Sequence, residues 1–345
     1  MSENSTTSGV IDCKKVILNL ENTKKLHSAY LVGLNSEHAR DNLQEMAEKS
    51  DMLESIISGL EEVFPGVSIE EAKEIMGNNF LGPEVAKTAL GIEFKGEIPP
   101  IEFSPEILEK LKDTHRLVFY FDKFSYGQED GIVMTGKKLY EMLYEILKGK
   151  KKDGAEIMDR YIEGPWFNNE KFFTEETPNI GWKLVSKAII PKSTNKNYLE
   201  QTDCIAETIR NLYGDVLKIP DDVGQALKEW GDLKNDTEEY TKLQNDIVSS
   251  DEERWKSVGD ALDSLKLTKM FRESVLEWFY WMVLNESIND GKIMNDHNLW
   301  TKSRTISGTF VRVDRSTAGG PLHIDGDWPT ERYSDVGCVF SASKL

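Results

Sequence analysis

The chain has 345 residues, 39% of them apolar, and its 8 Trp, 14 Phe and 11 Tyr are typical of a folded protein with a large buried core. A formal net charge of -18 argues against nucleic acid or an anionic membrane surface as a partner, because both would repel the protein. The charge is unevenly spread: residues 300–345 hold six basic and five acidic side chains, a net +1, which leaves -19 on the remainder.

Cysteine usage and the start of the chain bear on its location. Cys13, Cys204 and Cys338 lie far apart without the spacing of a zinc site, so we predict free thiols, with Cys338 buried and inert. Residues 1–9 are polar and do not resemble a signal peptide, and no stretch approaches the roughly 20 apolar residues of a membrane span. The default expectation is a cytoplasmic protein without membrane insertion, with surface display by another route left open.

The N-terminal part is predicted to be helical. Residues 1–14 are expected to form a disordered tail, and residues 15–98 a helical domain, because apolar residues recur there at helical spacing. Ser68 precedes acidic residues as a helix cap, Gly77 is expected to end that helix, and a short helix should follow Pro83. This domain could dock a partner or an oligomer mate, or act as a simple spacer.

Prolines 99 and 100 suggest a boundary, so a second domain is expected over residues 99–345. A helix should begin at Pro105, a strand should cover residues 117–121, and residues 138–147 have one apolar stripe typical of an amphipathic helix. The aromatic-rich residues 164–182 are expected to lie in a core, with a ligand shelf as the alternative.

A strand is predicted over residues 182–190 and a helix over residues 196–213. Residues from about 219 to 264 read as an acidic helical insertion with a solvated face. The segment 272–284 is apolar nearly all round, which predicts a buried helix that backs a sheet.

The tail alternates apolar and polar residues. A strand over residues 309–314 would place Val311 and Val313 on one face, and a strand over residues 321–325 would bury Leu322 and Ile324. A glycine turn at residues 317–320 would join them. Residues 336–340 are apolar throughout, as expected of a strand covered on both faces.

These segments resemble the C-terminal variable region of target proteins of diversity-generating retroelements. The resemblance covers about residues 100–345 and is carried by the following residues: Leu299-Trp300-Thr301, Phe310-Val311-Arg312-Val313, Gly326-Asp327-Trp328-Pro329, Val336-Gly337-Cys338-Val339-Phe340-Ser341, Pro178-Asn179-Ile180-Gly181-Trp182-Lys183-Leu184-Val185 and Pro191-Lys192-Ser193-Thr194-Asn195-Lys196-Asn197-Tyr198. It implies a bacterial protein with a C-type-lectin-like fold, whose surface positions are rewritten by an error-prone reverse transcriptase that randomises template adenines. It also implies a ligand-binding protein that performs no chemistry.

The genetic code identifies candidate ligand-binding positions. Randomising both adenines of an asparagine codon gives many residues but never Lys, Glu, Gln, Met or Trp, so Trp328 and Glu331 are expected to be fixed or to come from another codon. The outward candidates all belong to the permitted set: Arg304, Ser307, Asp314, Arg315, Ser316, His323, Asp325, Asp327, Arg332, Tyr333, Ser334 and Asp335. Any solvated hairpin could carry such residues, which is the plainer alternative. Of the candidates, Tyr333, Arg304, Arg315 and Arg332 are expected to carry most of the affinity.

Motifs of common enzymes are missing: there is no GxSxG, P-loop, HExxH, or GxGxxG in a βαβ setting. We therefore predict no catalytic residues, no metal and no cofactor. The sugar-binding tripeptides of calcium-dependent lectins do not occur either, so carbohydrate binding does not follow from the resemblance. Two other functions stay open: an enzyme on the same fold using His297, His323 and Asp325, or a structural or oligomerisation protein.

The sequence thus predicts an α+β protein, with an N-terminal helical domain, then a C-type-lectin-like domain with a helical insertion, and a variable region at about residues 300–345. Its partner would be a protein or another macromolecule of variable identity. The scaffold is expected to be held by buried side chains: Trp300, Val311, Val313, Leu322, Ile324, Trp328, Val336, Cys338 and Phe340. Oligomeric state does not follow from the sequence.

Overall fold

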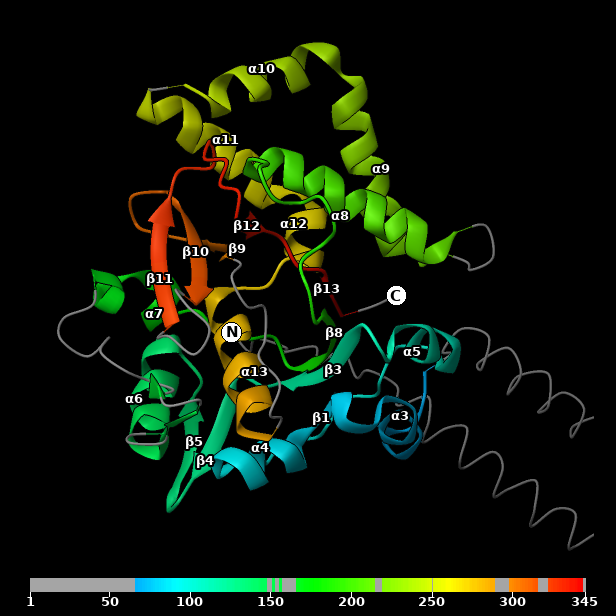
Figure 1. Ribbon diagram of the computed structural model, residues 1–345, viewed down its shortest axis with the longest axis vertical. Helices are drawn as coiled ribbons and strands as arrows, with labels where there is room; N and C mark the ends of the chain where they lie inside the picture. The colour runs from blue at the N-terminus through cyan, green and yellow to red at the C-terminus, as the bar shows by residue number, and fades with distance from the viewer. Residues whose placement is uncertain are drawn as a thin grey trace, which may run out of the picture. The chain divides into compact units, whose positions relative to one another are not determined.

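The computed structural model describes residues 66–147, 151–152, 155–156, 166–214, 219–249, 251–288, 298–315 and 322–343 (Figure 1). Contacts divide the chain into two units, residues 1–66 and residues 67–345, and the fold given below is that of the second unit. The tail predicted over residues 1–14, and the helices predicted before residue 66, lie outside the described residues.

The domain boundary predicted between residues 98 and 99 was wrong, because it falls inside the second unit. Strand β1 (Phe80–Leu81) pairs in parallel with β3 (His115–Tyr120), and β2 (Ile92–Glu93) pairs with β4 (Lys123–Tyr126). The prolines therefore sit in a connection between paired elements, and the carbonyl of Pro99 accepts a hydrogen bond from the Trp182 indole at 3.0 Å. Proline punctuates the chain locally but does not report such long-range pairing.

The second unit is an α+β fold, as predicted. Its described helices are α3 (Ile69–Met76), η1 (Gly77–Asn79), α4 (Pro83–Leu90), α5 (Pro105–Leu111), α6 (Gly136–Leu147), η2 (Trp166–Asn169), α7 (Lys171–Thr174), α8 (Tyr198–Tyr213), α9 (Asp221–Asn235), α10 (Thr237–Ile247), α11 (Glu252–Ser264), α12 (Lys266–Phe271) and α13 (Val275–Ile288). None of the helices in this described part is long and apolar enough to span a bilayer. The remaining described strands are β5 (Glu129–Val133), β6 (Lys151–Lys152), β7 (Ala155–Glu156), β8 (Gly181–Ser186), β9 (Asn298–Arg304), β10 (Phe310–Arg315), β11 (Leu322–Asp327), β12 (Val336–Gly337) and β13 (Ser341–Ala342).

One four-stranded sheet has the order β1-β3-β8-β13. Leu117 of β3 lies opposite Leu184 of β8, and both are buried. Strand β13, near the end of the chain, pairs antiparallel with β8. This pairing brings the tail back to the strand that precedes α8.

The tail builds a second sheet, in the order β11-β10-β9-β12. Strand β10 runs antiparallel to both of its neighbours, and Val313 lies opposite Ile324 of β11. The two strands predicted around the turn are therefore confirmed, while the turn at residues 317–320 lies outside the described residues. Residues 336–340 are all buried, as predicted, but they form a two-residue strand and a connection rather than one long strand.

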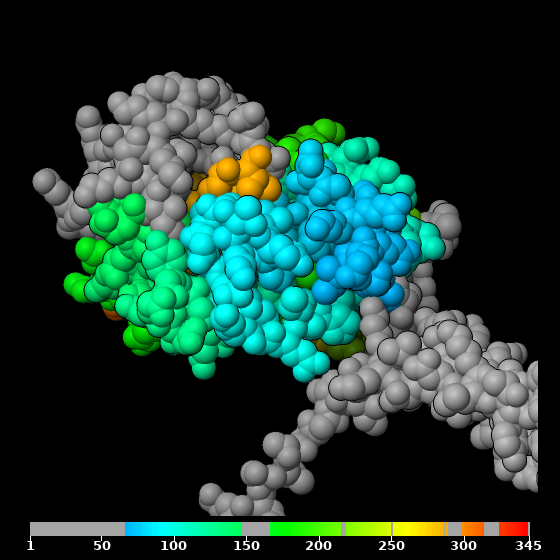
Figure 2. Space-filling model, turned by 90° about the horizontal axis from the view of Figure 1, so that it is seen from below, coloured from blue at the N-terminus to red at the C-terminus, as the bar shows by residue number. Residues whose placement is uncertain are grey.

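Helix α13 lies between the layers of the second unit (Figure 1). Residues 275–284 are all buried, and the helix contacts β1 of one sheet and both β9 and β10 of the other. Part of this stretch of the chain reaches the surface beside α4, as the orange atoms next to the cyan ones show (Figure 2). Ile288, the last residue of the helix, is exposed near Val85 of α4. The prediction of a buried helix that backs a sheet is confirmed, because a helix apolar on every side has no face to give to water.

Local capping signals were also correct. The Ser68 hydroxyl accepts a hydrogen bond from the Glu71 amide at 3.2 Å, and Gly77, with a φ of 52°, ends α3. Helix α8 begins at a capping box in which Asn197 and Glu200 each accept a hydrogen bond from the other's backbone amide. The capping box fixes the first residue of α8. The position of this residue in turn determines which side chains of α8 face the tail sheet.

Candidate binding surface

The pairing of β10 with β11 sorts the tail residues by face. Val311 and Val313 are fully buried, and Ile324 is buried opposite Val313. Phe310, on the alternate face, is also buried, because its ring stacks on Tyr198 of α8 with centroids 3.9 Å apart. Both faces of the tail sheet are therefore covered at Phe310. On the Phe310 face, polar side chains reach solvent from Arg312 onward.

Arg312 organises the polar part of this face. Its guanidinium lies 3.1 Å from a carboxylate oxygen of Asp325 and 3.1 Å from one of Asp327. The Tyr333 ring packs against the same guanidinium, with its centroid 4.9 Å from Cζ. We name Arg312, Asp325, Asp327 and Tyr333 the arginine cluster.

Burial raises the pKa of the Asp327 carboxyl, and the charge of Arg312 opposes that rise. Burial and the neighbouring Asp327 likewise raise the pKa of Tyr333. Arg312 was not among the predicted site residues, although the alternation of Asp325 and Asp327 was visible. The sequence pattern does not give the strand register, and it is this register that sets Arg312 opposite Asp325.

Two predicted surface positions instead have structural roles. The Arg304 side chain is only 15% exposed, donates to the Gly308 carbonyl from Nε and Nη2, and forms an ion pair with Asp260 of α11 at 2.8 Å. Its guanidinium also lies over the Phe310 ring. Asp327 is largely covered and paired with Arg312. The prediction that these two side chains point freely outward was wrong, because each neutralises a partner supplied by another segment.

The other predicted positions divide into three groups. Ser307, Arg332, Ser334 and Asp335 are exposed, while Asp325 and Tyr333 are half-buried. Arg332 pairs with Glu200 at 2.9 Å, and Asp335 accepts a hydrogen bond from the Asn298 side chain at 2.8 Å. The structure describes neither Ser316 nor the side chains of Asp314, Arg315, Leu322 and His323.

Trp328 is an exception among the predicted scaffold residues. It is 48% exposed and stacks on Trp255 of α11, with ring centroids 6.0 Å apart and an angle of 23°. The prediction that it is buried was wrong, because Trp328 follows the end of β11 and meets a helix of the insertion instead of the sheet. Trp300, Val336, Cys338 and Phe340 are buried as predicted.

A buried charge network lies beside α13, and sequence reasoning missed it. Glu273 accepts hydrogen bonds from the Tyr120 hydroxyl at 2.7 Å and the Trp281 indole at 2.8 Å. Glu277 pairs with Lys183 at 2.5 Å and with Lys302 at 3.2 Å. The Lys302 amide also donates to the Glu273 carbonyl, so the network ties β9 to the start of α13.

The two carboxyls of this network titrate in opposite directions. Burial, reinforced by the charge of Glu277, raises the pKa of Glu273 to about 7. Burial also penalises the charged form of Glu277, but Lys183 and Lys302 outweigh it and lower its pKa to about 2. Both carboxyls are inside the protein, so this network is suited to joining elements rather than to contacting a ligand.

Evidence for catalytic or metal chemistry is sparse in the described residues. They contain no group of three His, Cys, Asp or Glu side chains placed to hold a metal. His297 lies outside them, and of His323 only the backbone register, opposite Asp314, is described. The free thiols Cys204 and Cys338 are buried, and burial raises the pKa of Cys338 to about 12, in agreement with an inert cysteine.

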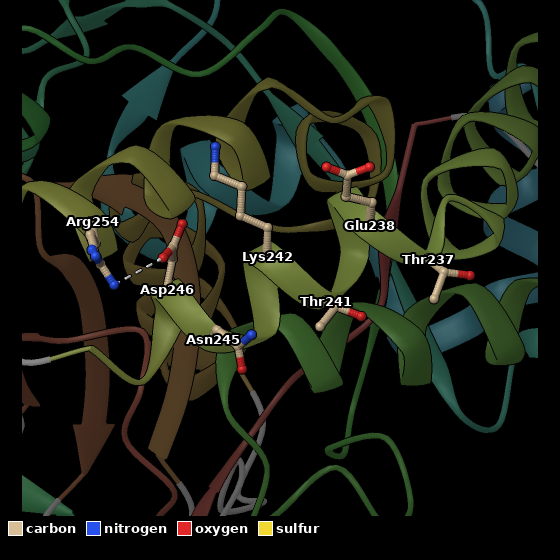
Figure 3. A pocket seen from close by; sticks show the side chains of 7 residues that line it. All are labelled: Thr237, Glu238, Thr241, Lys242, Asn245, Asp246 and Arg254. Atoms are coloured by element: carbon tan, nitrogen blue, oxygen red, sulfur yellow. Dashed lines mark ion pairs between the residues drawn. The ribbon is translucent and has the colours of Figure 1, made fainter.

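A shallow hollow lies along α10, away from the tail. Figure 3 shows that its polar side chains spread along the helix instead of converging on one point, with Arg254 and Asp246 joined by an ion pair of 3.8 Å. The arrangement has no activated nucleophile and no acid–base pair aimed at a shared position, so the tail surface is the stronger candidate.

Comparison of the chain with protein-family models, curated proteins and solved structures gave no match.

Proposed function

We propose that this protein is the variable protein of a diversity-generating retroelement, and that it binds a macromolecular ligand, the surface of another protein, through the outward residues of its tail. In this proposal, the second unit is a C-type-lectin-like domain carrying a helical insertion. The protein performs no chemistry, and Asp325 and Tyr333 of the arginine cluster, with their exposed neighbours, form the ligand-contacting surface.

The single observation that carries the proposal is the separation of covered and exposed positions within residues 300–345. Val311, Val313 and Ile324 are buried, whereas Ser307, Arg332 and Ser334 are exposed. A surface of this kind can change its exposed side chains at small cost, because such substitutions usually change stability by about 0.5 kcal/mol or less.

The order of elements gives further support. A strand (β8), a helix (α8), the acidic helices α9 to α11 and the buried helix α13 precede the tail sheet, in the order predicted from the sequence for a strand, a helix, an acidic helical insertion and a buried helix. The contacts of Arg304 and Asp327 narrow the proposed variable set, since a change at Arg304 would remove the ion-pair partner of Asp260, and a change at Asp327 would remove one of the two partners of Arg312.

The proposal is tested in the DNA around the gene. We expect a near-identical repeat of the region encoding residues 300–345, beside a reverse-transcriptase gene, which differs at template adenines. The differing codons should be those of exposed positions such as Ser307, Arg332 and Ser334. Absence of the repeat, or differences concentrated at Val311 and Val313, would contradict the proposal.

A further inference from the structure

Three large apolar side chains are exposed around one turn of the tail sheet. Trp166 is 46% exposed, Ile306 67% and Trp328 48%. Trp166 and Trp328 are the exposed tryptophans of the described residues. We name these three side chains the apolar patch. Exposed tryptophan is uncommon without a role, because its large ring gains much from burial.

Trp166 and Ile306 are fixed on one side of the turn. The Trp166 indole donates a hydrogen bond to the Ile324 carbonyl of β11 at 2.9 Å, and its ring lies 3.4 Å from where a Cβ on Gly326 would sit. The Ile306 amide donates to a carboxylate oxygen of Glu170 at 2.6 Å. Both residues are therefore held by contacts between the tail and the segment around η2 and α7.

Helix α11 closes the other side of the turn. Trp255 stacks on Trp328, and the Lys256 ammonium lies 5.8 Å from the Trp255 ring centroid. The Lys256 side chain also lies 3.2 Å from where a Cβ on Gly308 would sit. The apolar patch thus joins the tail to η2, and the buried Trp255 ring of the helical insertion packs under Trp328.

The turn that carries Ile306 is internally braced. The Thr305 hydroxyl lies 2.8 Å from the Ser307 hydroxyl and 2.7 Å from the Thr309 hydroxyl. Arg304 fastens the same turn through the Gly308 carbonyl. A preorganised turn loses little conformational freedom when a partner binds, which favours affinity.

Charge indicates what kind of partner fits. Residues 221–264 contain thirteen acidic and five basic side chains, a net charge of -8. Glu253, on the same helix as Trp255, is exposed, whereas Asp260 and Glu252, with side chains 77% and 63% exposed, form ion pairs with Arg304 and Lys256. A second copy of this chain would bring the same acidic helices to the contact and be repelled, whereas a basic protein surface would be attracted.

We infer that the apolar patch is a fixed anchor for a protein partner that inserts an apolar side chain flanked by Lys or Arg, while the exposed tail residues around the patch adjust specificity. This inference rests on the proposed function and adds the partner's chemistry to it. Trp328 suits a fixed role, since randomised adenines in an asparagine codon never yield tryptophan. Aromatic anchors inside a polar rim are the usual hot spots of protein interfaces.

The test is selection of a random dodecapeptide library, displayed on phage, against the full chain. We expect enriched peptides to combine an aromatic or aliphatic residue with Lys or Arg. A synthetic enriched peptide should bind at least ten-fold more weakly to Trp328→Ala and to Ile306→Ser. The matched control is Val248→Ala, because Val248 is 60% exposed on the insertion but outside the patch. Replacing Glu252 and Glu253 by Gln should weaken binding mainly at low salt.

Failure of this inference can be told from failure of the proposed function. Peptide binding that survives Trp328→Ala and Ile306→Ser, but is lost in Asp325→Ala or Arg332→Ala, would overturn the anchor and leave the tail as the binding surface. Peptide binding that is unchanged in both sets of variants would overturn the anchor and the proposed function together. A library that yields no enriched peptide would have the same consequence. A dimer in sedimentation that dissociates in Trp328→Ala would assign the patch to a second copy and overturn the basic partner.

Discussion

Individual side chains of the tail acquire different roles from the segments that face them. Arg304 and Arg312 both lie on strands of the tail sheet, yet Arg304 braces a turn and Arg312 pairs with two carboxylates. Ser307 and Ser334 contact solvent and can change at little cost. Tolerance to substitution is therefore set residue by residue, by partners and burial.

Glu273 is predicted to make stability depend on pH. Its pKa is about 7 in the folded protein and near 4.5 when unfolded, so the folded state holds an extra proton between these values. That contribution is present in full below pH 4.5 and is lost as the pH rises through 7, a change of about 3 kcal/mol. Glu273→Gln should remove it, because the amide can accept from Trp281 and donate to Tyr120.

The measurement is urea unfolding of wild type and Glu273→Gln from pH 4.5 to 8. His115 contributes in the opposite direction, since burial lowers its pKa to about 4, but it is common to both proteins and cancels in the difference. The wild type should lose stability relative to the variant as the pH rises. Parallel curves would contradict the assignment.

Phe310→Ala is predicted to cost about 3–5 kcal/mol of unfolding free energy, because a fully buried ring stacked on Tyr198 would leave a cavity. Ile306→Ala, in the adjacent turn, removes an exposed side chain and should cost about 0.5 kcal/mol or less. Urea titration measures both. Similar losses in the two variants would show that the face assignment is wrong.

Whole elements were more predictable than their contacts. The apolar period identified α8, α13 and the β10–β11 pair, because burial of a helix or strand face is written into neighbouring residues. The pairing of Arg312 with Asp325 and Asp327 depends on strand register, and the stacking of Trp328 on Trp255 joins residues over seventy positions apart. The residues next to each position in the sequence do not indicate such distant partners. For this reason the predicted burial of Trp328 and the predicted exposure of Arg304 and Asp327 were wrong.

At the level of one helix, Asn197→Ala should destabilise the start of α8. The substitution removes the acceptor for the Glu200 amide at 2.9 Å and should cost about 0.5–2 kcal/mol. Amide hydrogen exchange should accelerate in the first turn of α8. Asp236→Ala, which removes the cap of α10, is the control and should accelerate exchange in α10 alone. Unchanged exchange in α8 after Asn197→Ala would contradict the role of the capping box.

The insertion is predicted to be part of the packed domain. Trp230 of α9 is fully buried, and its indole donates to Asp203 of α8 at 3.0 Å. Trp230→Ala should therefore cost about 3–5 kcal/mol, and Trp230→Phe, which keeps most of the ring area, clearly less. Equal and small losses in urea unfolding would show that the insertion is dispensable for stability.

On the scale of the whole molecule, two sheets share one buried helix, and the end of the chain closes back on β8. The covered face of the tail sheet therefore packs into the core. Among the described residues of this sheet, only those along one edge reach solvent. The buried network of Glu273, Glu277, Lys183 and Lys302 connects β9 with α13. Because the sheet is held in this way, we expect the side chains along its exposed edge to be replaceable without loss of the fold.

The separation of covered and exposed tail positions is tested most directly by thermal and urea unfolding of two matched panels. One panel carries Ala, His and Tyr at Asp325, Arg332 and Ser334, and the other carries the same three residues at Val311, Val313 and Cys338. We expect losses of about 1 kcal/mol or less in the first panel and of at least about 2 kcal/mol in the second. Comparable losses in both panels would contradict it.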